Sequence, residues 1–486
     1  IFEKRAPQLG YNQPYLDNLL GGFFFAGSPS SQQVKGVSAS PTDLTTIELV
    51  DLVRPSVANI VYVYCLDIAN MQPNLSGLSQ PRYNFCGSSK GSGFIINKTG
   101  VIATNGHVTK IYPEEGLVTN LLNEGSKAFA TDLIKGVYSS KGQTLGQNQL
   151  EDFYRQLNAN PQYLDRFLTE IFALINKKAI VINNTNEKYY VNVGDAPVKV
   201  DYQKLNIGDA VGAVSPSATT YVAEMLDFNF PNRYSYEAIV NKNYQRGADV
   251  ALLKIKNSSN LFPAVELGSI ENLREGSEVI VAGYPTLVEG AEDPRAALSY
   301  KTSTKPTITR GIVSAIKEDI VGKKVLQTDA SIDHGNSGGP AFNSLGQVIG
   351  IATFMEESKS GNFNFLRDIS ELKELMAKNK IDNQLGELTT YWREGLSNFR
   401  NKYYTSAKTS FKQVETLSPA HPTVKEFITL SDEAIAEGKS LEGWVGFIKG
   451  GKGSGILLGA FGSLAIISFM SSGFLWSLPL FRQERV

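Results

Sequence analysis

Residues Thr328 to Pro340 read TDASIDHGNSGGP, and this stretch decides the fold. Ser337 is surrounded by glycines at positions 335, 338 and 339. Glycine tolerates sharp backbone bends, so the N–H groups of Gly335 and Ser337 can converge on one point. Two converging N–H groups beside a hydroxyl are what an oxyanion hole and its nucleophile require. Because a serine in a glycine-rich turn is common, the assignment depends on a histidine and a carboxylate elsewhere in the chain.

Both partners occur upstream of Ser337. His107 lies in IATNGHVT and Asp249 lies in GADVALLKI, which gives the chain order His, Asp, Ser. Ser337 Oγ would attack a carbonyl carbon, His107 would take and return the proton, and Asp249 would hold the imidazole in one tautomer. Taken singly, each residue is better explained without catalysis: His107 as a strand-end histidine, Asp249 as a turn residue and Ser337 as a loop hydroxyl. Together, in this order, they predict a catalytic triad.

The same glycine-rich turn also fits the G-x-S-x-G elbow of α/β-hydrolases. In that fold the catalytic histidine follows the serine, and only His421 is available there, within a helical region. The β-rich surroundings of Ser337 and the presence of His107 argue against this alternative.

Four stretches resemble the HtrA/Deg branch of the trypsin-like serine proteases: RPSVANI, GSGFIINKTGVIATNGHVT, ADVALLKI and TDASIDHGNSGGPAFNSLGQVIGIAT. The resemblance covers about residues 47 to 376, apart from an insertion. It implies a trypsin-like double β-barrel with the active site between the barrels. It also implies peptide-bond hydrolysis through an acyl-enzyme, with the N–H groups of Gly335 and Ser337 as the oxyanion hole and with no cofactor or metal.

Three departures from that family stand out. No PDZ domain is visible from residue 383 onward. His334 replaces a common proline and would lie at the mouth of the primary specificity pocket; a solvated loop residue is the alternative. Asn336 replaces the aspartate that would pair with a trypsin-like activating N-terminus, so we do not expect activation by N-terminal cleavage at Ile1.

Composition and periodicity predict a mainly β chain with added helices. The chain has 486 residues, is 42% apolar and has a formal charge of −1, so nucleic acid is not an expected partner. Strands are predicted at Val57–Ile68, Gly91–Asn97 and Val101–Thr104, with a polar loop between the first two. The predicted parts are an extended arm (1–46), the protease domain (47–378) with a helical insertion (about 111–178), a helical segment (379–440), a juxtamembrane stretch (441–455), a transmembrane helix (456–480) and a basic tail (481–486).

Cys65 and Cys86 are too few for a disulfide-built scaffold and lack metal-site spacing. They could face each other across an antiparallel strand pair. A disulfide and two buried thiols are equally good interpretations.

The C-terminal third is predicted to be helical and then membrane-spanning. Residues 395–419 have the spacing of one tetratricopeptide unit, although a plain helical hairpin is the simpler interpretation. One repeat cannot bury its own apolar face, so it should dock on the β domain, the membrane-proximal segment or a partner. Residues 456–480 carry no charge and would reach about 37 Å as a helix, enough for a hydrocarbon core of ~30 Å.

The sequence therefore predicts a membrane-anchored serine endopeptidase that acts on unfolded or flexible polypeptides. With the protease domain extracytoplasmic, the C-terminal Arg482 and Arg485 would be cytoplasmic, which agrees with the positive-inside rule. The insertion or residues 383–440 could hold a protein partner. The alternative is a protease-fold binding or scaffold subunit of a membrane complex with weak or no activity.

Overall fold

The computed structural model describes residues 44–70, 79–194, 198–206, 208–243, 245–284, 305–319, 322–333, 335–358 and 361–442. All of them fall within one compact unit, residues 43–486. Nearly all of the predicted N-terminal arm, His334, the transmembrane segment 456–480 and the basic tail lie outside the described residues. No helix in the described ranges is long and apolar enough to cross a membrane.

Six antiparallel strands close the first barrel, in the order β1-β2-β3-β8-β7-β4. Alternating apolar side chains fill it, among them Ile60, Ile95, Ile102 and Leu253, all fully buried. The strands are β1 (Val57–Asn70), β2 (Arg82–Asn97), β3 (Val101–Thr104), β4 (Ile180–Asn192), β7 (Thr220–Asn229) and β8 (Val250–Ile255). The predicted strands are confirmed. The prediction of a loop at residues 82–90 is wrong. They continue β2 because they pair with residues 61–69 of β1.

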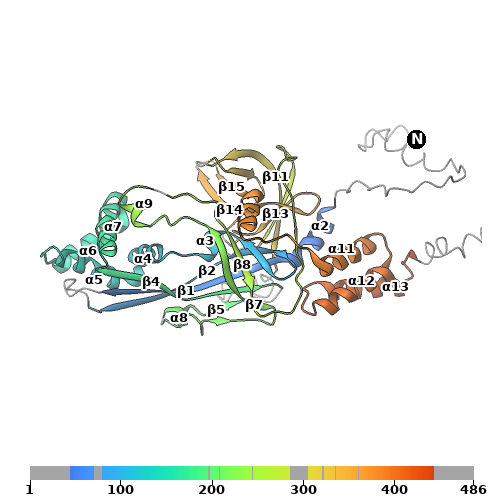
Figure 1. The fold of residues 1–486 in the computed structure, drawn as a ribbon, viewed down its shortest axis with the longest axis horizontal. Helices are drawn as coiled ribbons and strands as arrows, with labels where there is room; N and C mark the ends of the chain where they lie inside the picture. Colours follow the sequence, from blue (N-terminus) through green and yellow to red (C-terminus); the bar gives the residue numbers. More distant parts are fainter. Residues whose placement is uncertain are drawn as a thin grey trace, which may run out of the picture. The chain divides into compact units, whose positions relative to one another are not determined.

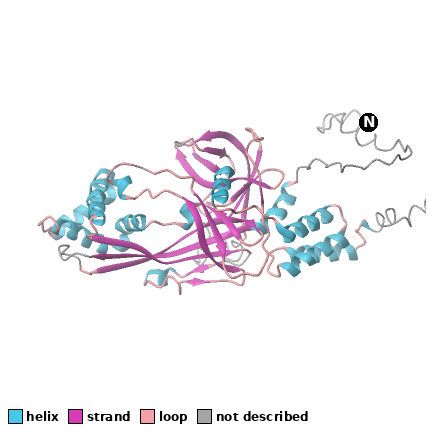
Figure 2. Cartoon of the chain, viewed as in Figure 1, coloured by secondary structure: helices cyan, strands magenta, loops and turns pink. Residues whose placement is uncertain are grey.

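The second barrel follows in the chain and closes where β13 pairs with β14. Val279, Val313, Leu326 and Leu366 form its buried interior. Its strands are β10 (Glu278–Gly283), β11 (Thr307–Glu318), β12 (Lys324–Thr328), β13 (Pro340–Phe342), β14 (Gln347–Ser358) and β15 (Gly361–Asp368), with β9 (Glu266–Leu267) added in parallel to β14. The predicted mainly β fold with two barrels is therefore confirmed (Figures 1 and 2).

Short elements connect these strands. They are the 3₁₀ turns η3 (Arg54–Ser56) and η4 (Glu124–Ser126), the helices α3 (Gly106–Thr109), α8 (Tyr202–Asn206) and α9 (Tyr236–Ile239), and the pair β5 (Lys199–Val200) and β6 (Val214–Ser215).

Four helices make up the insertion between His107 and β4: α4 (Pro113–Leu122), α5 (Lys127–Ser139), α6 (Gln147–Ala159) and α7 (Pro161–Asn176). They gather around the ends of β1, β2 and β4 (Figure 1). Their apolar faces share one core with Leu66 and Ile68 of β1, in which Leu117 and Ile171 are fully buried. The insertion is thus a packed subdomain anchored on the first barrel.

Helices also lie before the first barrel and after the second barrel in the sequence. α2 (Thr46–Val53) precedes β1, and α10 (Ile369–Lys378), α11 (Gly386–Arg400), α12 (Tyr404–Leu417) and α13 (Val424–Ala436) follow β15. Trp392 of α11 is buried against Phe411 and Phe427. Its indole N–H donates to the carbonyl of Asp51 in α2 (3.2 Å). The C-terminal helices therefore pack against the helix that leads into the first strand.

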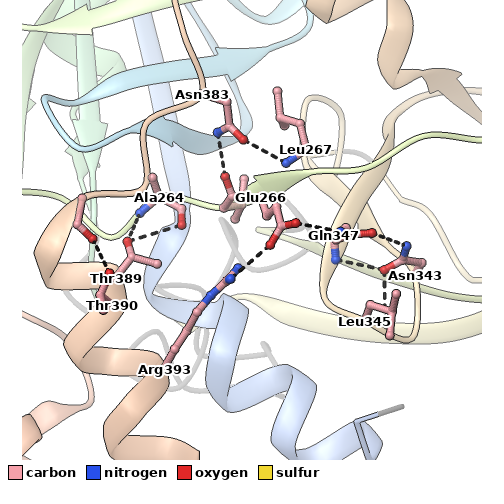
Figure 3. A network of polar contacts seen from close by, with 12 residues as sticks. Ala264, Glu266, Leu267, Asn343, Leu345, Gln347, Asn383, Thr389, Thr390 and Arg393 are labelled. Atoms are coloured by element: carbon pink, nitrogen blue, oxygen red, sulfur yellow. Dashed lines mark hydrogen bonds and ion pairs between the residues drawn. The ribbon is translucent and has the colours of Figure 1, made fainter. Parts of the chain in front are cut away.

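A polar network attaches α11 and its leading segment to the barrels (Figure 3). Asn383 donates to the carbonyls of Ile96 (2.7 Å) and Val265 (2.9 Å). Arg393 reaches Glu266 (3.0 Å), which also accepts from Gln347 of the second barrel (2.7 Å). Of the three docking sites considered for these helices, the β domain is the one observed.

Candidate active site

His107 and Asp249 form a hydrogen-bonded pair at the ends of two neighbouring strands. His107 lies in α3, directly after β3, and Asp249 comes directly before β8, which pairs with β3. His107 Nδ1 lies 2.8 Å from Asp249 Oδ2. The backbone N–H of His107 donates to Asp249 Oδ1 (2.9 Å). The Asp249 carboxylate thus holds the imidazole with one oxygen and the main chain of His107 with the other, leaving Nε2 for a substrate or nucleophile proton.

Asp249 adopts a left-handed backbone conformation, with φ of 57°. Its N–H donates to the carbonyl of Asn229 at the end of β7 (2.8 Å). Non-glycine residues seldom adopt this conformation, and those that do cluster at functional sites. The bend turns the carboxylate toward His107 just before the chain enters β8.

The pair shifts the pKa of both members. Burial lowers the pKa of His107, but the charge and hydrogen bond of Asp249, helped by Glu115, outweigh it, so the pKa lies above its ordinary value. Burial raises the pKa of Asp249, but His107 outweighs it, so that pKa lies below its ordinary value. The His107 side chain keeps 37% of its surface exposed, which leaves it open to a substrate.

The nucleophile loop, residues 333 and 335–339 around the candidate nucleophile Ser337, is held by backbone hydrogen bonds. Asn336 N–H donates to the carbonyl of Asp333 (2.9 Å), and Gly335 has a φ of 94°. Glycine adopts a positive φ of this kind without a steric penalty. Gly338 N–H donates to Ala352 (2.8 Å) and Gly339 N–H to Asn336 (2.8 Å).

Two backbone N–H groups of this loop have no hydrogen-bond acceptor among the described residues. Among the described residues, the N–H groups of Gly335 and Ser337 donate to no protein acceptor, whereas those of residues 336, 338 and 339 all do. Gly335 is buried and Ser337 half-buried. Buried donors without acceptors are costly, so their persistence here fits a site that receives an oxygen atom from a ligand.

The nucleophile loop packs against the segment that carries His107. A Cβ atom placed on Gly338 would lie 2.2 Å from Thr104 Oγ1 and 3.1 Å from Asn105 N, so only glycine fits. Within the described residues, no hydrogen bond joins Ser337 Oγ to His107. Catalytic hydrogen bonds are often long in a ligand-free enzyme and tighten when substrate binds.

The insertion forms one rim of this site. Tyr112, just before α4, stacks on Phe230 with ring centroids 6.0 Å apart and donates to the Phe230 carbonyl (2.6 Å). Phe230 in turn lies beside His107, with centroids 6.4 Å apart. Through Tyr112 and Phe230, the start of the insertion thus lies beside His107.

Other predicted residues lie elsewhere. His421 is buried against Trp392, with ring centroids 4.5 Å apart, in the C-terminal helices, which leaves the α/β-hydrolase alternative without its histidine. Cys65 and Cys86 are paired across β1 and β2 and form a disulfide. In the described part of the chain, no three His, Cys, Asp or Glu side chains are grouped to hold a metal ion.

Sequence reasoning missed the polar residues that support the site. Asn105 donates to the carbonyl of Asp249 (2.7 Å) and to Thr353 Oγ1 (3.1 Å), and Ser92 bonds to the nucleophile loop. Both lie in stretches that already carried the family resemblance. The available signal was a small polar residue in an otherwise buried strand or strand end.

This chain is similar to a known protein family, to curated proteins and to solved structures. Residues 193–351 match the family of the trypsin-like peptidase domain. This trypsin-like peptidase domain match includes Asp249 and Ser337, whereas His107 lies before it, on the other side of the insertion.

Curated proteins similar to this chain include HtrA-type proteases. The chain is 38% identical over 120 residues to "Putative protease Do-like 14" of Arabidopsis thaliana, covering 23% of this chain and 24% of that protein. It is 28% identical over 212 residues to "Serine protease HTRA2, mitochondrial" of Bos taurus, covering 41% of this chain and 40% of that protein. The chain thus spans less than half the length of these relatives.

A solved structure, "HtrA-type protease AlgW with decapeptide", is similar with a TM-score of 0.34 and 18% identity, over 70% of this chain and 69% of that one. A likeness of that size says little about this chain by itself. The sequence matches support a serine endopeptidase of the HtrA type.

Proposed function

We propose that this protein is a serine endopeptidase in which Ser337 is the nucleophile, His107 the general base and acid, and Asp249 the residue that orients His107. The observation that carries the proposal is the pair of N–H groups at Gly335 and Ser337 that have no acceptor among the described residues, on a loop packed against the segment that leads into His107. An HtrA-type relationship supports the same assignment.

Each group has a defined task in acyl transfer. Ser337 Oγ attacks the scissile carbonyl while His107 Nε2 accepts its proton. The developing oxyanion accepts hydrogen bonds from the two N–H groups, each worth about 3 kcal/mol in the transition state. His107 then protonates the leaving amine, and water hydrolyses the acyl-enzyme by the same route. Asp249 stabilises the imidazolium through its 2.8 Å bond to Nδ1.

We extend the proposal to substrate and setting. The substrates are unfolded or flexible polypeptides, as the HtrA resemblance implies. The apolar segment 456–480 anchors the chain in a bilayer, with the protease domain extracytoplasmic and the C-terminus cytoplasmic. The Cys65–Cys86 disulfide supports an oxidising compartment. The helices of 383–440, with their tetratricopeptide-like spacing, remain a candidate partner site.

A second candidate function is a scaffold subunit without turnover. The absence of a Ser337–His107 hydrogen bond among the described residues favours it, as does the insertion at the rim of the site.

Turnover of a denatured polypeptide separates these two functions. Purified full-length protein should degrade reduced, unfolded casein, and Ser337→Ala should abolish that degradation while folding normally. Equal degradation by both proteins would mean a contaminating protease. No degradation by a folded wild type would favour the scaffold.

A further inference from the structure

Ser92 on β2 forms hydrogen bonds with the nucleophile loop and with the strand that leads into His107. Among the described residues it forms no hydrogen bond with His107 or Asp249 themselves. It is fully buried, with no exposed surface. It belongs to the first barrel, yet its side chain and its backbone N–H bond to residues of the second. A buried serine between two barrels needs partners for its hydroxyl, and here every polar group of the residue is engaged.

The hydroxyl of Ser92 has one donor and one acceptor contact. Its Oγ donates to the carbonyl of Gly335 (2.7 Å). It also accepts from the backbone N–H of Tyr284, just after β10 (2.8 Å). Because the Tyr284 N–H can only donate, the Ser92 hydroxyl uses its own proton for the Gly335 carbonyl.

The backbone of Ser92 adds two further contacts. Its N–H donates to the carbonyl of Ser337 (2.8 Å). Its carbonyl accepts from Thr104 Oγ1 (2.7 Å), three residues before His107. One residue thus ties the nucleophile loop to the strand that leads into the catalytic histidine.

These contacts act on the peptide group that links Gly335 to Asn336. Ser92 holds its carbonyl, and Asp333 accepts its N–H (2.9 Å). With both polar ends fixed, that peptide plane cannot rotate without breaking a buried hydrogen bond, which costs about 1–3 kcal/mol. The orientation of the neighbouring Gly335 N–H depends on this plane, because both share the Gly335 Cα.

We propose that Ser92 is a positioning residue for the oxyanion hole: its hydroxyl holds the Gly335 carbonyl so that the N–H groups of Gly335 and Ser337 stay directed at one point. This inference rests on the proposed function and deepens it. Ser92 is fully buried, so it can act only through the loop. Its loss should weaken binding of the transition state and leave binding of the ground state intact.

The test compares Ser92→Ala with Ser431→Ala in the full-length protein. Ser431 is also fully buried and donates to a backbone carbonyl, that of Phe427 (2.7 Å), but it lies in α13. Each variant loses one buried hydroxyl, but Ser92→Ala also leaves the Gly335 carbonyl and the Tyr284 N–H without that partner. Ser92→Ala should therefore be the less stable variant, and kcat is compared at a temperature where both are folded. We expect kcat on a peptide substrate to fall about 10- to 100-fold in Ser92→Ala, less than the roughly 10²- to 10³-fold loss when an oxyanion-hole donor is removed outright, because the donors are displaced and not deleted. In Ser431→Ala, kcat should stay near wild type.

Two readouts distinguish positioning from general damage. A peptide aldehyde, whose hemiacetal oxygen occupies the oxyanion hole, should bind Ser92→Ala more weakly by the same factor as kcat falls. The matching peptide alcohol, which forms no such oxygen, should bind with unchanged affinity. The pKa of the acid limb of the pH profile should also stay constant, since the His107–Asp249 pair is untouched.

Several outcomes would overturn the inference. Equal kcat in Ser92→Ala and Ser431→Ala would do so, as would a parallel loss of aldehyde and alcohol affinity. If Ser92→Ala does not fold, Ser92→Cys keeps the side-chain size with a weaker donor, and it should show a smaller loss of the same kind; wild-type kcat there would contradict the role. A wild type inactive toward every substrate would instead refute the proposed function.

Discussion

His107 Nδ1 lies 2.8 Å from one carboxylate oxygen of Asp249, and the backbone N–H of His107 donates to the other oxygen at 2.9 Å. The aspartate therefore holds both the ring and the main chain of the histidine. This double contact requires Asp249 to turn back at the start of β8 with a φ of 57°.

Replacing Asp249 by Asn should remove the tautomer control while keeping the backbone conformation, because Asn tolerates the left-handed region. We expect kcat to fall by about 10⁴-fold, because the asparagine would hold the imidazole in the wrong tautomer. Asp227→Asn is the control, since Asp227 on β7 bonds to Lys378 and Asn379 rather than to His107. Comparable losses in both variants would contradict the role of Asp249.

The acid limb of the pH–activity profile should reflect His107. Only neutral His107 can accept a proton, so activity should fall as pH drops through its raised pKa. Glu115 raises this pKa and Arg233 lowers it. Glu115→Gln should thus move the limb to lower pH, and Arg233→Gln to higher pH. Glu114 accepts a hydrogen bond from Asn232, so Glu114→Gln is the control and should leave the acid limb in place. Shifts of the same sign in Glu115→Gln and Arg233→Gln would contradict this electrostatic account.

Stability should depend on pH through His421. Burial lowers the pKa of His421 to about 3, and neither ring nitrogen has a partner among the described residues. The unfolded chain takes up this proton near its ordinary pKa, about 6.5, so it binds more protons than the folded chain between these values. The free energy of unfolding should therefore fall by about 1.4 kcal/mol per pH unit below that point.

The His421→Leu variant removes this titration and keeps an apolar contact with Trp392. Urea unfolding between pH 7 and pH 4.5 should show a shallower loss of stability in the variant than in the wild type. Parallel pH profiles would show that His421 is not the group responsible.

The Cys65–Cys86 disulfide joins β1 to β2 across a sequence separation of 21 residues. Replacing both residues by Ala should lower the free energy of unfolding by about 3 kcal/mol, chiefly because the unfolded chain gains freedom. The disulfide lies away from the nucleophile loop, so kcat of the folded variant should match the wild type. Equal denaturation midpoints for the wild type under oxidising and reducing conditions would contradict a stabilising disulfide.

The sequence could predict the features that depend on local patterns. The strands Val101–Thr104 and Gly91–Asn97 follow from apolar alternation, and His107 and Ser337 stand in recognisable contexts. It could not predict the strand at 82–90, whose polar residues form a strand only because β1 pairs with them. For the same reason Ser92 escaped notice: its partners, Gly335 and Tyr284, are distant in the chain and meet only when the barrels close.

The central claim is that Ser337 is an activated nucleophile, and labelling with a fluorophosphonate probe tests it most directly. Such a probe bonds covalently to a serine only where a base and an oxyanion hole support the attack. Incubation of the folded full-length protein, followed by mass mapping of the adduct, should place one phosphonyl group on Ser337. His107→Ala should slow labelling by orders of magnitude, and Ser337→Ala should abolish it. No adduct on a folded wild type, or an adduct that persists in Ser337→Ala, would contradict the account.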